Sequence, residues 1–176
     1  MTESDLPLVL HWRNQPHIRQ NMYTDHTITP DEHAAWFAGV SADGSSVPQL
    51  FECEKRPLGV VNFSDFARHD ERCRWGFYIG EPGARKGLGT VLGILAMEFA
   101  FGSLGMRKVT GEAFAFNEAS LRLHRRLGFF EEGRLIAHVH KNGRYEDIIV
   151  MAHFAEHWAS LKDSLTEKYL SEGVTT

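Results

Sequence analysis

A glycine-rich segment carries residues suited to binding an anion. Residues 80–90 read Gly-Glu-Pro-Gly-Ala-Arg-Lys-Gly-Leu-Gly-Thr; they follow a predicted strand and lead directly into a predicted helix. Gly87 and Gly89 leave consecutive backbone N–H groups unobstructed, beside the positive end of the helix dipole. Arg85 and Lys86 add cations at the rim. The segment predicts a pyrophosphate-binding turn; the alternative is a glycine-lined helix start that packs closely on a sheet.

A second segment lies further along the chain. Residues 117–129 read Asn-Glu-Ala-Ser-Leu-Arg-Leu-His-Arg-Arg-Leu-Gly-Phe, with Asn at a strand end and Gly-Phe at a helix exit. Together, R-K-G-L-G-T and N-x-x-S-x-x-x-x-x-x-L-G-F resemble the GCN5-related N-acetyltransferase (GNAT) superfamily, whose acetyl-CoA site uses these two motifs. The resemblance covers nearly the whole chain. Ala84 departs from it, because the family commonly has Gln or Arg there.

The resemblance implies how the cosubstrate acetyl-CoA is held. The backbone of Arg85, Lys86, Gly87, Leu88, Gly89 and Thr90 would bind the CoA pyrophosphate, the backbone of Phe77, Tyr78 and Ile79 would pair with pantetheine, and Asn117 would bond the pantetheine arm. A splayed pair of parallel strands, 73–79 and 108–116, leaves N–H and C=O groups that the two cofactor amides satisfy. An amide near Ile79 would polarise the thioester carbonyl.

Three residues are candidates for proton transfer. Acetylation of an amine needs a base that takes a proton from the nitrogen, and the leaving thiolate takes one back. Glu112 is the candidate base, as a lone carboxylate in the apolar run Val109–Phe116; alternatively it pairs with an arginine or faces solvent. His124 stands where many enzymes of this type have a Tyr that protonates the thiolate, and a structural helix histidine is the alternative. Tyr145, in the last predicted hairpin, is a third candidate.

The N-terminal residues are expected to select the acceptor. His11-Trp12-Arg13-Asn14-x-Pro16-x-Ile18-Arg19, with the residues that follow, is similar to acetyltransferases of pseudaminic acid biosynthesis. Those enzymes acetylate the 4-amino group of UDP-4-amino-4,6-dideoxy-N-acetyl-altrosamine, a precursor for flagellin glycosylation. The predicted acceptor-binding residues are Arg13, Asn14, Arg19, Met22, His33 and Trp36, which offer donors for a nucleotide diphosphate and apolar surface for a 6-deoxy sugar. Open alternatives are a helix with solvated arginines, a protein N-terminal (ribosomal-protein-type) acetyltransferase, and a non-catalytic acyl-CoA-binding module.

The predicted elements alternate in type. A helix is expected at 5–14, and a second short helical piece after Pro16 ends near residue 22. A third helix is expected to begin at a Thr29 cap with Glu32 and to end in the region 39–44. The remaining elements are an antiparallel meander at 49–54, 58–66 and 73–79, a helix at 88–99, a strand at 108–116, a helix at 118–127, a hairpin of 129–139 and 144–151 around Lys141-Asn142-Gly143, and a helix at 154–169. We predict one α/β (α+β) domain over 1–176, with a core at about 5–160 and a C-terminal helix and tail at 154–176. The resemblance implies the GNAT acyl-CoA N-acyltransferase fold, a mixed central sheet with splayed strands 4 and 5 flanked by helices.

Composition sets the remaining expectations. The 176 residues are 43% apolar with a net charge of −4, which fits one globular domain and provides no basic field for nucleic acid. Two cysteines without C-x-x-C spacing, no charged and apolar leader, and no apolar run of membrane length predict a cytoplasmic protein without a membrane partner. The histidine pairs lack further ligands, so we predict no metal. A homodimer is left open. The strand that usually precedes the first helix in the superfamily is expected to be missing, which would expose a sheet edge.

Overall fold

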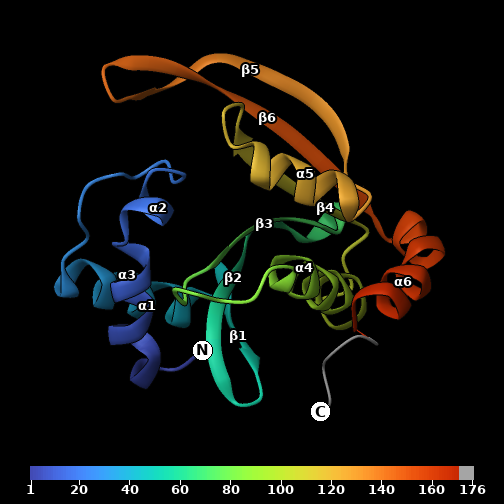
Figure 1. Ribbon diagram of the computed structural model, residues 1–176, viewed down its shortest axis with the longest axis horizontal. Coiled ribbons are helices and arrows are strands. Elements are labelled where there is room, and N and C mark those ends of the chain that lie inside the picture. The colour runs from blue at the N-terminus through green and yellow to red at the C-terminus, as the bar shows by residue number, and fades with distance from the viewer. Residues whose placement is uncertain (171–176) are drawn as a thin grey trace.

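Six strands form one mixed sheet in the order β1-β2-β3-β4-β6-β5 (Figure 1). The computed structural model describes residues 1–170. The strands are β1 (Ser46–Cys53), β2 (Arg56–Ala67), β3 (Arg72–Ile79), β4 (Lys108–Phe114), β5 (Phe130–Lys141) and β6 (Arg144–Phe154). The pair β3 and β4 is parallel and the other neighbours are antiparallel. The predicted meander and mixed α/β class are confirmed; residues 171–176 of the predicted tail lie outside the described part.

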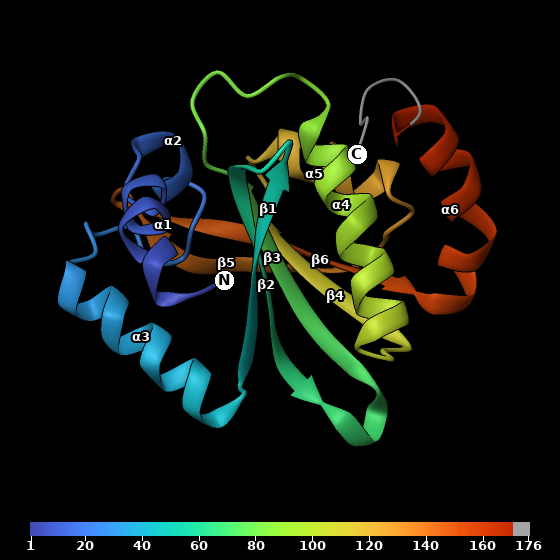
Figure 2. The same ribbon diagram turned by 90° about the horizontal axis from the view of Figure 1, so that it is seen from below.

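Helices cover both faces of this sheet. They are α1 (Leu6–Arg13), α2 (Pro16–Arg19), α3 (Pro30–Asp43), α4 (Leu88–Glu98), α5 (Glu118–Arg126) and α6 (Ala155–Leu170), with a π-helical turn at Phe99–Ser103 and 3-10 turns at Glu3–Asp5 and Arg68–Asp70. α1 to α3 lie on one side of the strands, and α4 and α6 lie on the other (Figures 1 and 2). Within residues 1–170, none of the helices combines the length and the apolar character needed to cross a membrane.

The start of α3 follows the predicted capping box. Thr29 Oγ1 accepts a hydrogen bond from the Glu32 backbone N at 3.2 Å, and a Glu32 carboxylate oxygen accepts one from the Thr29 backbone N at 2.7 Å. The helix runs to Asp43 and ends at Gly44, whose φ of 64° is in the left-handed region. The helix that leads toward the acceptor side is therefore defined by local sequence at both ends.

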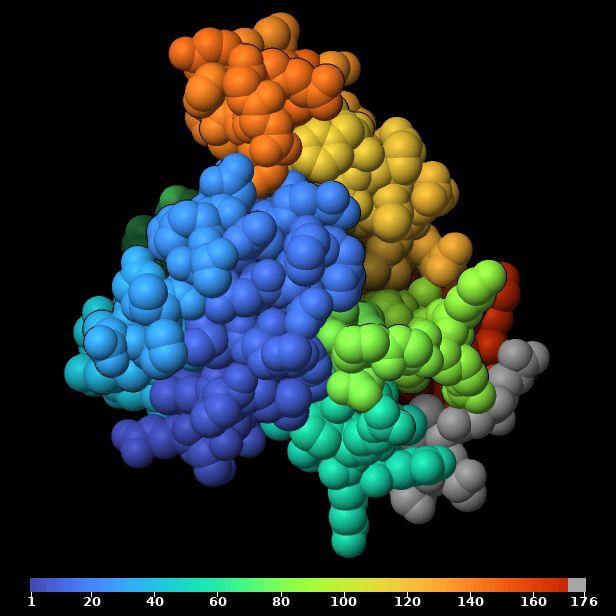
Figure 3. Space-filling view, turned by 60° about the vertical axis from the view of Figure 1, so that its left-hand side comes forward, coloured from blue at the N-terminus to red at the C-terminus, as the bar shows by residue number. Residues whose placement is uncertain are grey.

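The last hairpin is longer than predicted. β5 includes Lys141, and the turn is reduced to Asn142 and Gly143, so the prediction that Lys141 belongs to the turn is wrong. β6 likewise extends to Phe154, which pairs with Lys108. In Figure 3 the tip of this hairpin, in orange, lies against the N-terminal segment, in blue. The extra length brings Lys141 into contact with Met22 and Asp25 of the N-terminal segment.

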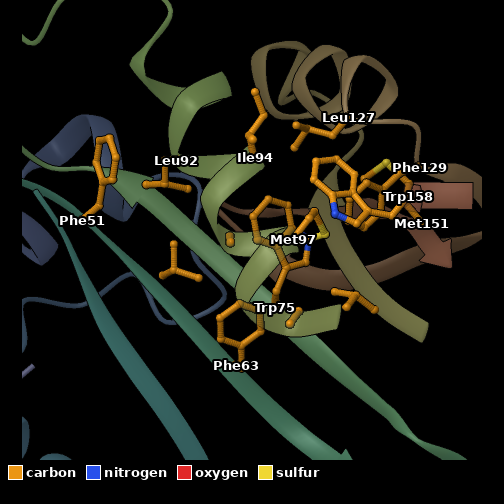
Figure 4. Packing of buried hydrophobic residues seen from close by; sticks show 14 of the residues in the cluster. Phe51, Phe63, Trp75, Leu92, Ile94, Met97, Leu127, Phe129, Met151 and Trp158 are labelled. Carbon is orange, nitrogen blue, oxygen red and sulfur yellow. The ribbon is translucent and has the colours of Figure 1, made fainter. Parts of the chain in front are cut away.

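The main core fills the space between the sheet and α4 to α6. Phe63, Trp75 and Met97 belong to this core and are almost fully buried (Figure 4). Gly93 of α4 permits a close contact between helices: a Cβ there would lie 2.4 Å from a Leu127 methyl group, so Gly93 lets α4 approach the end of α5. Helix-to-helix contact thus places the two predicted motifs side by side.

The parallel strands β3 and β4 diverge along their length. They pair from Arg72 with Lys108 to Trp75 with Gly111, over four residue pairs. Beyond these pairs, β3 continues along β2 and β4 continues along β6. Among residues 1–170, the facing edges of β3 after Trp75 and of β4 after Gly111 have no strand partner. The predicted splay is confirmed, and it opens a wedge in the middle of the sheet.

Candidate active site

Three cavities meet around the splay, and Met22 and Gly76 line all of them. The splay cleft, about 330 Å³, lies between β3, β4 and α5 and is lined by residues that include Phe77, Tyr78, Ile79, Asn117, Ser120 and His124. The Glu112 cavity, about 220 Å³, is lined by residues that include Tyr23, Asn62, Ser64, Arg74 and Glu112. The Arg13 cavity, about 470 Å³, is lined by residues that include Arg13, Thr24, Glu32, His33, Trp36 and Asn62.

Gly76 marks the place where the cavities meet. It follows Trp75, the last β3 residue paired with β4, so it lies at the start of the splay. A Cβ built on Gly76 would find no atom within 4 Å, and its φ is not in the left-handed region. The glycine therefore serves to leave open space rather than to permit an unusual backbone. Groups entering from the three cavities can meet beside it.

The glycine-rich turn has the geometry of an anion site. Gly87 adopts φ 97° at the start of α4, a conformation that favours glycine. Among residues 1–170, the backbone N–H groups of Arg85, Lys86 and Gly87 have no backbone partner. These free N–H groups, together with the positive end of α4, suit a pyrophosphate.

Gly89 and Thr90 of the same turn face α5. A Cβ on Gly89 would lie 3.6 Å from a Leu123 methyl group, and Thr90 Oγ1 accepts a hydrogen bond from Arg126 at 3.0 Å. The Thr90 side chain is therefore used within the protein. What Leu88, Gly89 and Thr90 offer to an anion is their backbone at the start of α4.

The splay cleft suits the pantetheine arm. Phe77, Tyr78 and Ile79 line it and have no strand partner on the β4 side. Asn117 begins α5, and its Oδ1 accepts a hydrogen bond from the Ser120 backbone N at 3.1 Å. Its amide NH₂ group remains available to donate. Phe77, Tyr78, Ile79 and Asn117 thus line one cleft together with Gly76.

Glu112 lies in a polar network rather than among apolar side chains. Its Oε2 accepts a hydrogen bond from Tyr23 Oη at 2.6 Å and lies 3.3 Å from Arg74 Nη1. Arg74 also pairs with Asp65 at 2.8 Å. The alternative of an ion pair with an arginine is therefore confirmed, yet Glu112 still lines both the Glu112 cavity and the splay cleft. Burial and the hydrogen bond to Glu112 raise the pKa of Tyr23, so its phenol stays protonated and donates.

His124 is buried in α5 and is not poised to donate a proton. Its Nδ1 donates to the Ser120 carbonyl oxygen at 2.9 Å, which leaves Nε2 as the unprotonated nitrogen. Burial lowers the pKa of His124 to about 4. At neutral pH Nε2 therefore has no proton for a leaving thiolate, and the geometry argues against the acid role expected from the family pattern.

Tyr145, the third candidate for proton transfer, lies outside the three cavities. It lies in β6 opposite His140, near the tip of the long hairpin, and 67% of it is exposed. It lines none of the three cavities. The structure does not bring Tyr145 together with Glu112.

The Arg13 cavity combines a cation with a flat aromatic surface. Arg13 Nη2 donates to the Thr24 carbonyl oxygen at 2.9 Å, whereas Nη1 is buried without a hydrogen-bond partner in the described chain. His33 stacks on Trp36 with ring centroids 5.3 Å apart, and the Trp36 ring is partly exposed at the rim. Burial first, and then the charge of Arg13, lower the pKa of His33, which favours the neutral imidazole. The cavity suits an acceptor with a planar ring and a negative charge.

Two predicted acceptor residues instead hold the chain segment 20–28 in place. Asn14 makes two hydrogen bonds of 2.9 Å with the backbone of Ile28, and Arg19 donates to Thr27 Oγ1 at 2.5 Å. Neither side chain lines the three cavities. Asn14 and Arg19 therefore support the loop 20–28, and their contact with the acceptor stays a prediction.

Sequence reasoning missed three residues of the site. Tyr23 and Arg74 bond Glu112, and Asn62 lines two cavities with its Oδ1 buried and unpartnered within residues 1–170. Tyr23 lies in a loop without a motif. Arg74 and Asn62 are polar residues inside apolar strands, the same signal that singled out Glu112.

Two buried histidines predict that stability depends on pH. Burial lowers the pKa of His124 and of His153 to about 4, against an ordinary value near 6.5. Between these values the unfolded chain binds more protons than the folded chain. The free energy of unfolding therefore falls as pH decreases from about 6.5 toward 4, by up to about 1.4 kcal/mol per pH unit for each histidine. Urea denaturation at pH 7 and pH 5 measures this.

His153 can be tested separately from His124. His153→Phe removes one buried imidazole and leaves an aromatic ring among the rings that surround it. We expect this variant to lose stability less steeply with falling pH, whereas His138→Phe, at an exposed hairpin position, keeps the original slope. An unchanged slope in His153→Phe contradicts the assignment.

Comparison with known proteins agrees with this geometry. A family model described as the acetyltransferase (GNAT) domain matches residues 1–130. Acetyltransferase PseH of Campylobacter jejuni is 26% identical over 79% of this chain and 87% of its own length. Spermidine N(1)-acetyltransferase of Escherichia coli is 30% identical over 60% of this chain, and the uncharacterized N-acetyltransferase YokL of Bacillus subtilis is 31% identical over 54%. These two matches span about half of each relative's length, 56% and 54%.

Solved structures share the fold. Spermidine N-acetyltransferase from Vibrio cholerae, solved with CoA and spermine, superposes with a TM-score of 0.85 at 20% identity, over 90% of this chain and 95% of that one. Ribosomal-protein-alanine N-acetyltransferase from Brucella melitensis gives 0.74 at 24% identity, over 88% and 96%. With the family model covering residues 1–130 and the splayed strands in place, the chain belongs to the GNAT acetyltransferase family.

Proposed function

We propose that this protein transfers the acetyl group of acetyl-CoA to the 4-amino group of a UDP-linked 4-amino-4,6-dideoxy sugar, the UDP-4-amino-4,6-dideoxy-N-acetyl-altrosamine of pseudaminic acid biosynthesis. The family accounts for acetyl transfer. The single observation that favours this acceptor is half-buried Arg13, whose buried Nη1 has no hydrogen-bond partner within residues 1–170 and which lines a cavity of about 470 Å³. A guanidinium nitrogen that is buried without a hydrogen-bond partner is costly, and a phosphate oxygen would offset that cost.

The charge of this cavity argues against a polyamine acceptor. Glu32 alone is acidic among the residues that line it, and its carboxylate is already bonded to the Thr29 backbone N and to His26. A polyamine would meet the positive charge of Arg13 there. The Trp36 ring offers a surface on which a uracil base can stack.

The residues around Gly76 suit acetyl transfer to an amine. When bound, acetyl-CoA supplies an acetyl group activated as a thioester. Glu112 accepts the proton that the amine nitrogen loses as its bond to the acetyl carbon forms and the carbon–sulfur bond breaks. Tyr23 and Arg74 hold the Glu112 carboxylate at the meeting point of the cavities. Backbone N–H groups of β3 near Ile79 face the splay and can stabilise charge on the thioester oxygen.

A thiol-release assay separates the candidate acceptors. The UDP-linked amino sugar, spermidine and amino-terminal peptides are compared at equal concentration with acetyl-CoA. The proposal expects the highest kcat/KM for the UDP-linked amino sugar; a higher value for spermidine or a peptide contradicts it. Calorimetric titration with CoA tests the shared step, and CoA binding without turnover of any amine would favour the non-catalytic module.

Arg13 provides the sharpest test of the acceptor. Arg13→Met is expected to lower kcat/KM for the UDP-linked amino sugar by roughly 10- to 100-fold, the effect of losing a hydrogen bond between charged groups. The same variant should lower kcat/KM for the amino sugar without UDP by less, roughly threefold to tenfold, because it also loses the hydrogen bond from Arg13 to the Thr24 carbonyl oxygen. Equal losses for both acceptors would mean that Arg13 only supports the fold.

A matched control uses Arg19. Arg19→Met also removes an arginine that holds the segment 20–28, but it removes no cation from the Arg13 cavity. We expect it to lower kcat/KM for both acceptors equally and weakly.

The proposal includes a cytoplasmic location, which the unpaired Cys53 and Cys73 support. The homodimer stays a prediction.

A further inference from the structure

A lysine at the tip of the long hairpin is buried although its neighbours are exposed. Lys141 is 2% exposed, whereas Asn142, Gly143 and Arg144 are all exposed. Its Nζ donates to the Met22 carbonyl oxygen at 2.9 Å and to Asp25 Oδ2 at 3.2 Å. It also lies 5.5 Å from the centroid of the Phe114 ring. A lysine is rarely buried to this degree unless its charge is paired, so this contact is a specific feature of the fold.

The segment that Lys141 holds contributes to the lining of all three cavities. Met22 lines all three, Tyr23 donates to Glu112, and the Thr24 carbonyl oxygen accepts from Arg13. On its N-terminal side the segment is tied by Arg13, Asn14 and Arg19. Residues of the C-terminal half also hold the segment: Lys141 donates hydrogen bonds to it, and Glu112 accepts one from it.

We infer that Lys141 is a positioning residue for the acceptor side of the site, acting through the segment Met22–Asp25. The ammonium fixes the Met22 carbonyl oxygen and the Asp25 carboxylate, so that Tyr23 between them meets Glu112. The inference rests on the proposed function, because it takes the Arg13 and Glu112 cavities as the acceptor site. Lys141 lines none of the cavities, and therefore acts without touching the acceptor.

Hydrogen exchange in the intact protein tests the contact without any acceptor. Lys141→Met keeps an apolar stem on Phe114 and removes the ammonium; Lys141→Arg keeps a cation. In Lys141→Met, amides of residues 20–28 should exchange about tenfold faster, as a loss of local stability near 1.4 kcal/mol produces. Amides of residues 85–90 should not change. An unchanged rate at 20–28, or equal acceleration throughout the chain, overturns the inference.

Steady-state kinetics then separate positioning from general support. Lys141→Met should raise KM for the acceptor and lower kcat, each by roughly threefold to tenfold, with the Kd for CoA unchanged, and Lys141→Arg should recover part of both losses. Lys162→Met serves as the matched control, because it removes a lysine of α6 that lies 3.8 Å from a carboxylate oxygen of Glu98 in α4. A parallel change in CoA affinity overturns the inference. If the wild type turns over no UDP-linked amino sugar, the proposed function fails, and the exchange result still decides the role of Lys141 in the segment.

Discussion

Replacing Glu112 with glutamine is expected to lower kcat for acetyl transfer by roughly 10²- to 10⁴-fold, the usual contribution of a general base. The glutamine keeps the shape of the side chain and an oxygen that accepts from Tyr23, but it cannot take a proton from the amine. The Kd for CoA should stay the same, because glutamine keeps the shape of Glu112 and Glu112 is not part of the glycine-rich turn that would hold the pyrophosphate. Initial rates from pH 6 to pH 9 and calorimetric titration measure both quantities.

The control for Glu112 is the other carboxylate on Arg74. Asp65 pairs with Arg74 at 2.8 Å and lines none of the three cavities. Asp65 has φ 53°, a backbone region that asparagine tolerates. Asp65→Asn should therefore keep kcat within about threefold of the wild type, as for an exposed ion pair. If Glu112→Gln turns over like the wild type at every pH, Glu112 is not the base.

The second large effect is expected at Gly76. A valine there places a branched side chain at the point where the three cavities meet, so amine and thioester can no longer approach each other. We expect kcat/KM to fall by roughly 10²-fold or more, since displacements of about 1 Å have effects of this size. The fold should tolerate the change, because a Cβ at Gly76 meets no atom within 4 Å and valine is favoured in strands.

Gly133 offers a matched control for Gly76. It also lies in a strand, β5, and a Cβ there would likewise find no atom within 4 Å. Gly133→Val makes the same chemical change away from the cavities and should leave kcat/KM unchanged. Thermal unfolding shows whether each variant is folded. A folded Gly76→Val with full turnover would mean that transfer takes place elsewhere.

The cosubstrate side of the site could be predicted because its determinants are local. Gly87, at the start of α4, needs a left-handed backbone, and a glycine directly before an apolar helix reveals this in the sequence. The capping box of Thr29 and Glu32 is equally local. The motif spacing also predicted the splay, because the family resemblance places two parallel strands at 73–79 and 108–116.

The acceptor side could be predicted less well because it depends on contacts between distant residues. Tyr23 reaches Glu112 across 89 positions, and Lys141 reaches Met22 across 119. No local sequence pattern predicts contacts between residues this far apart in the chain. Arg13, Asn14 and Arg19 also look alike in sequence as hydrogen-bond donors. Only the course of segment 20–28 decides that two of them bond the loop while Arg13 keeps a free Nη1.

The short parallel contact between β3 and β4 also bears on the order in which the chain folds. β1 to β3 pair among themselves, as do β4 to β6, and four residue pairs join the two groups. Hairpins between neighbours in sequence close quickly, whereas parallel pairing across a long connection is slow. We therefore expect the joint between the two groups to form last and to open first. A molecule that binds both strand edges holds this joint closed, so cosubstrate binding also stabilises the native chain.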